Sequence, residues 1–176
     1  MNIRKFVVMP LIAIAVFILE GVSSLMFSQS FFGEQRFFIP HFLIVMLVLM
    51  ATFYGRNPTL IYAFILGMVF DIYYTGILGI YFAIFPLVVY LTDKFMKVLQ
   101  NSLILVGLVV VFNVILTECL VYSFYLLIGG TDMLFSTFVD QRLWTTILLN
   151  LAFFLVVFFP FRSFLLELKR SDGRWN

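Results

Sequence analysis

Long apolar runs separated by short polar segments make up most of the chain. An apolar run of about 20 residues is long enough to cross the hydrocarbon core of a bilayer as a helix. We therefore predict an all-α integral membrane protein with six transmembrane helices in a single polytopic membrane domain, residues 1–176. The predicted spans are 6–28, 38–54, 59–74, 78–91, 103–128 and 143–160, followed by a tail over 162–176.

The third and fourth predicted spans, 59–74 and 78–91, are shorter than a helix that crosses a bilayer perpendicularly. Pro86 lies inside the fourth span, where it removes a backbone hydrogen bond and is expected to kink the helix. Two readings stay open. The pair forms two full crossings that are kinked or partly shielded from lipid, or it forms a re-entrant hairpin.

Composition agrees with a membrane environment. Hydrophobic residues make up 64% of the chain and charged residues only 11%, whereas soluble domains contain about 25% charged residues. The net charge of +2 gives no basic stripe that would indicate nucleic-acid binding. The single Cys119 excludes an intramolecular disulfide. The single His41 has no neighbouring ligands that would indicate a metal site, and we expect it to lie at the membrane interface.

The positions of Lys and Arg orient the helices, because cytoplasmic loops carry an excess of these residues. If the N-terminus is cytoplasmic and the chain crosses six times, both termini are cytoplasmic and only Arg36 and Arg142 lie outside. The inner side then holds Arg4, Lys5, Arg56, Lys94, Lys97, Arg162, Lys169, Arg170 and Arg174. The tail carries apolar residues at helical spacing, which is typical of a helix along the membrane surface.

The third and fourth spans carry small residues and one carboxylate around a short turn. Gly67 lies one helical turn before Asp71, and Gly79 repeats the small-residue spacing on the other side of the turn. Small residues four positions apart let two helix backbones approach closely. We expect a tight hairpin in which Asp71 faces the seam, caps the fourth helix or binds a partner. The helix-packing or partner-binding candidates are Ala63, Gly67, Asp71, Gly76, Gly79 and Ala83.

Two further carboxylates, Glu20 and Glu118, fall in the outer halves of the first and fifth spans, near the predicted depth of Asp71. Intramembrane acids are costly and therefore usually have a role. With no Lys or Arg expected beside them, either some are protonated or they line a wet cavity. Hydrogen bonding between helices is the preferred reading, and a proton or cation path is the alternative. Asn113, Thr117 and Asn150 add polar groups on the last two helices.

No phosphate-binding glycine loop, nucleophilic triad or paired-histidine metal motif occurs in the sequence. We therefore predict a protein that is not an enzyme and that needs no cofactor or metal.

Four features carry a resemblance to a known family. They are Pro40 at the start of a span, the run Tyr54-Gly55-Arg56-Asn57-Pro58, the run Gly67-Met-Val-Phe-Asp71, and the run Gly76-Ile-Leu-Gly79-Ile-Tyr81. Over residues 40–91 the chain resembles the rod shape-determining protein MreD family. Ala63 stands where that family usually has glycine.

The resemblance implies a multi-pass protein of the bacterial plasma membrane. It would be a non-enzymatic scaffold or regulator of the elongation machinery that maintains rod shape through lateral peptidoglycan synthesis. It implies MreC as partner, with MreB, RodA and a class B penicillin-binding protein in a larger complex. It also implies a fold similar to the substrate-binding components of energy-coupling-factor transporters, so a vitamin-type transporter subunit is the alternative function. Dimerisation and the partner-binding face stay open.

Overall fold

The computed structural model describes residues 7–27 and 36–171, and all regular elements in these two ranges are helical. Four helical stretches are long and apolar enough to cross a membrane: Met9–Phe27, Arg56–Thr75, Leu103–Leu127 and Phe135–Ser171. This confirms the prediction of an all-α membrane protein. The elements are α1 (Met9–Phe27), α2 (Phe42–Phe53), α3 (Arg56–Phe70), the π-helical turn η2 (Asp71–Thr75), α4 (Ile80–Met96), α5 (Leu103–Leu127), α6 (Phe135–Phe138), the π-helical turn η3 (Val139–Leu143) and α7 (Trp144–Ser171).

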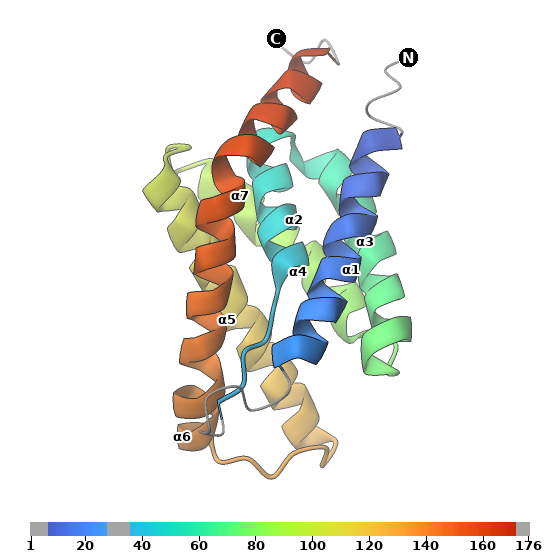
Figure 1. The fold of residues 1–176 in the computed structure, drawn as a ribbon, viewed down its shortest axis with the longest axis vertical. Helices are drawn as coiled ribbons and strands as arrows, with labels where there is room; N and C mark the ends of the chain where they lie inside the picture. Colours follow the sequence, from blue (N-terminus) through green and yellow to red (C-terminus); the bar gives the residue numbers. More distant parts are fainter. Residues whose placement is uncertain (1–6, 28–35, 172–176) are drawn as a thin grey trace.

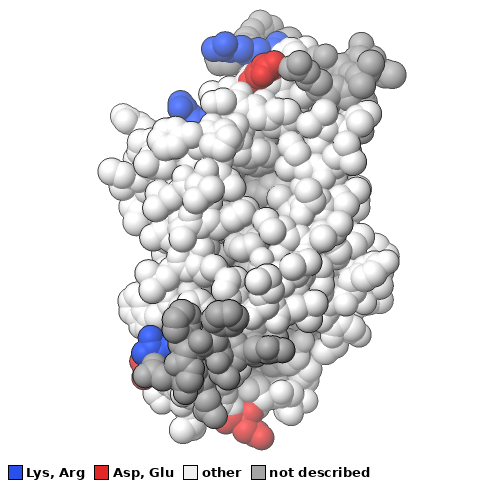
Figure 2. All heavy atoms as spheres, viewed as in Figure 1, with Lys and Arg blue, Asp and Glu red and all other residues white. Residues whose placement is uncertain are grey.

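The helices form a bundle in which consecutive long helices run in opposite directions (Figure 1). The start of α1 and the end of α7 lie at the same end of the bundle, which we call the α1/α7 end. The short helix α6 lies at the opposite end, which we call the α6 end. Charged side chains gather at these two ends on the face drawn in Figure 2, and a broad uncharged band separates them.

Helix α2 is the centre of the bundle and contacts α1, α3, α4, α5 and α7. Its sequence is apolar on every side, and only Thr52 is partly exposed. A helix that is hydrophobic all round must be buried by its neighbours. The opposite pattern holds for α1, where Leu11, Ile14 and Ile18 are exposed. The protein therefore buries one short helix completely and presents apolar side chains outward, as expected for lipid contact.

The boundaries of α3 and α4 differ from the prediction. Helix α3 begins at Arg56 and continues through η2 to Thr75, so this stretch is 20 residues long and not the short span expected over 59–74. The polar first turn of α3 contains Pro58. Proline is tolerated in the first turn of a helix because the backbone N–H that it lacks would have no partner within the helix. Helix α4 likewise runs to Met96, beyond the predicted end at residue 91.

The second predicted span, 38–54, is wrong at its start. Helix α2 covers only Phe42–Phe53, and residues 36–41 before it have no regular secondary structure. Figure 1 draws them as a stretched-out trace, and we call them the extended segment. Proline disfavours the helical conformation in the residue before it, which here is Ile39. The hydrogen bonds that hold this extended segment come mainly from α7 and from η3, which precedes it.

The hairpin of α3 and α4 is closely packed at Gly67. A Cβ atom added there would lie 2.6 Å from the carbonyl oxygen of Tyr81 and 2.9 Å from the Cα of Phe82. The backbone that Gly67 approaches is therefore the first turn of α4. The expectation that Gly79 and Ala83 form the opposing small-residue face is wrong, because both residues are exposed and a Cβ added at Gly79 would meet no atom within 4 Å.

Candidate functional site

The extended segment 36–41 carries backbone polar groups into the bundle, where they need partners. An unsatisfied backbone group inside a membrane costs several kcal/mol, so non-helical backbone persists there only where protein or water satisfies it. In this structure the partners are polar groups at the start of α7 and in η3. The partners are Gln141, Thr145, Thr146 and Asn150.

Asn150 makes the central contacts to this segment. Its Oδ1 accepts from the backbone N–H of His41 at 2.7 Å, and its Nδ2 donates to the carbonyl oxygen of Ile39 at 2.9 Å. One amide side chain thus replaces two of the hydrogen bonds that a helix would have supplied. Asn150 was expected only as a polar group on the last helix. The structure places it as the support of the unwound backbone.

Glu20 of α1 completes the start of α2. Its Oε2 accepts from the backbone N–H of Leu43 at 2.8 Å, and the side chain is fully buried. The N-cap residue His41 provides no side-chain hydrogen bond to the helix. A carboxylate at a helix N-terminus satisfies a free N–H and interacts favourably with the helix dipole. Glu20 therefore acts as an N-terminal cap supplied by another helix.

Glu118 of α5 is buried and contacts both His41, at the end of the extended segment, and Arg142 of η3. Its Oε1 lies 2.6 Å from Nε2 of His41, and its Oε2 accepts from Nε of Arg142 at 2.7 Å. His41 and Glu118 are buried and Arg142 is about a quarter exposed, at 26%. Two expectations are wrong here. His41 is not an interfacial side chain, and Glu118 does have a matching arginine.

Together, Glu20, His41, Glu118, Arg142 and Asn150 form what we call the α2 polar cluster. They come from α1, the extended segment, α5, η3 and α7, and they meet around residues 41–43. Sequence reasoning missed His41 and Arg142. Thr146 and Asn150 lie one helical turn apart on the same buried face of α7, and this polar pair was the sequence signal for the cluster, because polar side chains facing inward need polar partners.

Asp71 lies outside the cluster and caps a different helix. Its Oδ1 accepts from the N–H of Tyr81 at 2.9 Å, and its Oδ2 accepts from Gly79 at 2.8 Å and Phe82 at 3.1 Å. The chain reverses between these residues through Gly76, at φ 66°, and Gly79, at φ 113°. Both angles lie in the left-handed region that favours glycine. The close approach of the two helices at Gly67 brings the Asp71 carboxylate within reach of the α4 N-terminus. Ala63, two turns before Asp71 on α3, is buried.

Asn113 is also separate from the cluster. Its Nδ2 donates to the carbonyl oxygen of Val109 at 2.8 Å and to Oγ1 of Thr92 at 3.4 Å. The three carboxylates therefore do different work: two cap helix N-termini, and the third pairs with His41 and Arg142. No group of three or more metal-ligating side chains occurs within the parts of the chain that the structure describes.

Comparison with known proteins identifies the family. The sequence model described as rod shape-determining protein MreD matches residues 4–168. The chain belongs to the MreD family. It is 34% identical over 167 residues to the rod shape-determining protein MreD of Bacillus subtilis (strain 168), an alignment that covers 95% of this chain and 97% of that protein. No solved structure matches the chain significantly. The α2 polar cluster and the Asp71 cap are thus features of a member of the MreD family.

Proposed function

We propose that this protein is a non-enzymatic scaffold or regulator of the bacterial elongation machinery, which maintains rod shape through lateral peptidoglycan synthesis. The observation that carries the proposal is the MreD family match over nearly the whole chain. The structure supports a scaffolding role because the three buried carboxylates among the described residues, Glu20, Asp71 and Glu118, are engaged in holding helices together. Such groups provide a rigid framework, which a scaffold needs in order to present fixed surfaces.

The proposed topology is a single domain with six crossings of the plasma membrane and both termini in the cytoplasm. Helices that run alternately up and down the bundle support it, as does the position of the start of α1 and the end of α7 at one end (Figure 1). Arg56, Lys94, Lys169 and Arg170 belong to helix termini at this same α1/α7 end, as the positive-inside rule requires for the cytoplasmic side. A fold similar to the substrate-binding components of energy-coupling-factor transporters belongs to the same proposal.

The proposed partner is MreC, with MreB, RodA and a class B penicillin-binding protein in the larger complex. The outer turn of the α3–α4 hairpin is the candidate contact surface. Tyr73 and Leu78 are strongly exposed there, at 76% and 69%, while Asp71 holds the turn in place from below. A rigid turn with exposed aromatic and aliphatic side chains resembles the apolar anchors that dominate protein interfaces.

The transporter alternative requires polar groups that are available to a small molecule. The candidate side chains for lining such a pocket are Glu20, Asp71, Glu118 and Asn150, and each is engaged in hydrogen bonds within the protein. A ligand would have to compete with these bonds. This favours the scaffold over a substrate-binding subunit.

The experiment is affinity purification of the tagged chain from its own membranes, followed by mass spectrometry. We expect MreC and cell-wall synthases to co-purify with the unmodified chain and with Tyr73→Phe, and less MreC with Tyr73→Ala and Leu78→Ala. These changes lie at exposed positions, so chain levels should stay constant. Recovery of an ATPase pair with its coupling subunit, or of a bound small molecule, would instead establish the transporter function.

A further inference from the structure

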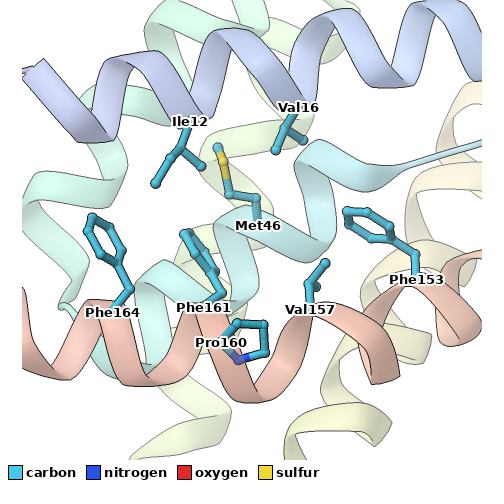
Figure 3. Close-up of a pocket in the computed structure, with 8 residues that line it drawn as sticks. All are labelled: Ile12, Val16, Met46, Phe153, Val157, Pro160, Phe161 and Phe164. Carbon is cyan, nitrogen blue, oxygen red and sulfur yellow. The ribbon is translucent and has the colours of Figure 1, made fainter.

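An apolar groove lies between α1 and α7, with α2 as its floor (Figure 3). It encloses about 320 Å³. Ile12 and Val16 line it from α1, and residues between Phe153 and Phe164 line it from α7. Met46 of α2 points into the space between the two walls (Figure 3). Every lining side chain is apolar, so the groove suits hydrocarbon.

The groove is closed toward the α6 end. Phe153, at the limit of the lining, stacks on Phe42 with ring centroids 4.0 Å apart. Beyond this pair the extended segment 36–41 runs between α1 and α7 (Figure 1). The segment bonds to α7 through Asn150, and its Phe38 contacts Phe27 of α1, with ring centroids 5.9 Å apart. The same unwound backbone that the α2 polar cluster supports therefore ends the groove.

The length of the groove selects its occupant. At a rise of 1.5 Å per residue, the wall from Phe153 to Phe164 extends about 16 Å along α7. The hydrocarbon core of a bilayer is about 30 Å thick, and a transmembrane helix needs a face of that length. The groove covers about half of it, which is the depth of one leaflet. A single acyl chain fits this geometry, and a spanning partner helix does not.

The charge at the open end favours an anionic headgroup. At the α1/α7 end of the described chain, Lys and Arg side chains outnumber the two carboxylates, Asp93 and Glu167. Arg162, Lys169 and Arg170 belong to α7, which forms one wall of the groove. Arg56, Lys94 and Lys97 belong to the ends of α3 and α4, where Arg56 and Lys97 pair with Asp93. Basic residues at the membrane surface attract anionic lipids by about 1 kcal/mol each.

The packing of α1 gives such a lipid a structural role. Hydrogen bonds hold α1 from its middle onward, since Phe17 accepts from the hydroxyl of Tyr74 at 3.1 Å and Glu20 bonds to Leu43. In the first half, Met9 and Ala13 are buried in the core, and Ile12 and Val16 line the groove on one side. On its other side lies a second apolar cavity of about 420 Å³, between Pro10 and Ile14 of α1 and residues of α3. Side chains that line an open apolar space lack packing partners on that side, so a hydrocarbon chain in the groove would complete the packing of α1.

We propose that the groove between α1 and α7 binds one acyl chain of an anionic phospholipid from the leaflet at the α1/α7 end. The chain lies over Met46 and completes the packing of the first half of α1 against α7. The assignment of that leaflet as the cytoplasmic one rests on the proposed topology. The lipid site itself does not depend on the proposed function.

The test uses acyl-chain photo-crosslinking on the full chain in vesicles of phosphatidylethanolamine and phosphatidylglycerol. A fraction of the phosphatidylglycerol carries a diazirine in one acyl chain, and labelled residues are mapped by mass spectrometry. Met46 is the reporter, because it is only 3% exposed and lines the groove. We expect Met46 to be labelled, and more strongly by phosphatidylglycerol than by a matched phosphatidylethanolamine probe.

Val157→Phe places a larger side chain in the groove, and Val156→Phe is its matched control. The two residues are neighbours on α7, and Val156 is 75% exposed on the outer surface. We expect Val157→Phe to lose most of the Met46 label and Val156→Phe to keep it. Ile12→Phe, which fills the groove from the opposite wall, should give the same loss if Val157→Phe does not fold.

Three results would overturn the proposal. Labelling of the outer surface of α7 without labelling of Met46 would show that no acyl chain enters the groove. Persistence of the Met46 label in both filling variants would show entry by another route. Loss of the Met46 label in native membranes that contain the same lipid probe would show that another membrane component occupies the groove. Each result is read from labelling alone, so it does not depend on whether MreC co-purifies.

Discussion

The close approach of α3 and α4 at Gly67 predicts that Gly67→Ala destabilises the protein, although alanine is the better helix former. A Cβ at this position would lie 2.6 Å from a backbone oxygen of α4 and 2.9 Å from a backbone Cα. Ordinary contacts begin at 3.4 Å. Backbone atoms cannot rotate away as a side chain can, so the two helices must separate by about 0.8 Å, the difference between 3.4 and 2.6 Å.

The magnitude combines three effects. Overpacking a well-packed site costs about 1–3 kcal/mol, and replacing glycine by alanine within a helix returns about 1 kcal/mol. The separation also stretches the hydrogen bonds that the N–H groups of Gly79 and Phe82 donate to Asp71. These bonds are 2.8 and 3.1 Å long in the unmodified protein, and the separation would take them beyond effective range. Each such bond contributes about 1 kcal/mol. We expect a net loss of about 2–4 kcal/mol, and a larger loss for Gly67→Leu.

The assay is reversible unfolding of the purified protein in mixed micelles, with thermal stability in detergent as a second measure. Gly107→Ala is the matched control, because an added Cβ there would meet only the ring of Phe154, at 3.1 Å. A side-chain ring can shift by a few tenths of an ångström, so this variant should stay close to the unmodified protein. The reasoning is refuted if Gly67→Ala is as stable as the unmodified protein, or if Gly107→Ala loses more.

Two further predictions concern the α2 polar cluster. Glu118→Gln and Arg142→Gln should each destabilise the fold, and a double-mutant cycle should give a coupling energy of about 1–3 kcal/mol, measured by the same unfolding assay; additive losses would contradict a direct pair. Asn150→Leu leaves the N–H of His41 and the carbonyl of Ile39 without a side-chain partner, so it should cost about 2 kcal/mol or more. The control Leu148→Ala, at an exposed position on the same helix, should be nearly neutral, and equal losses in the two variants would argue against the role of Asn150.

Several features were accessible from the sequence because they depend on local chemistry. Apolar runs of sufficient length predicted the membrane class, and the four candidate spans agree with that prediction. The small residues around Asp71 indicated a close hairpin, and the contact at Gly67 is indeed close. Asp71 itself allowed three readings from the sequence. Its bonds to Gly79, Tyr81 and Phe82 show the helix cap, and a role in partner binding stays a prediction.

The α2 polar cluster could not be derived in the same way. Glu118 and His41 are 77 residues apart in the sequence, and Glu118 and Arg142 are 24 residues apart. A hydropathy pattern shows whether a residue prefers lipid or water. It does not show which distant residue forms the hydrogen bond or ion pair that a buried polar side chain needs. For the same reason His41 was read as interfacial, and the first residues of the second span were read as helical although their backbone bonds to α7.

The sequence by itself thus determined that the protein lies in a membrane, the approximate positions of its apolar helices and the presence of acidic side chains that need partners. It did so because hydrophobicity and chain length act locally along the chain. Only the tertiary structure decided the partners of those acids, the unwinding before α2 and the backbone that meets Gly67. These depend on the relative position of helices far apart in the sequence. In the membrane interior each buried polar group must find a partner, and that partner can be any residue that the packing brings within hydrogen-bond distance.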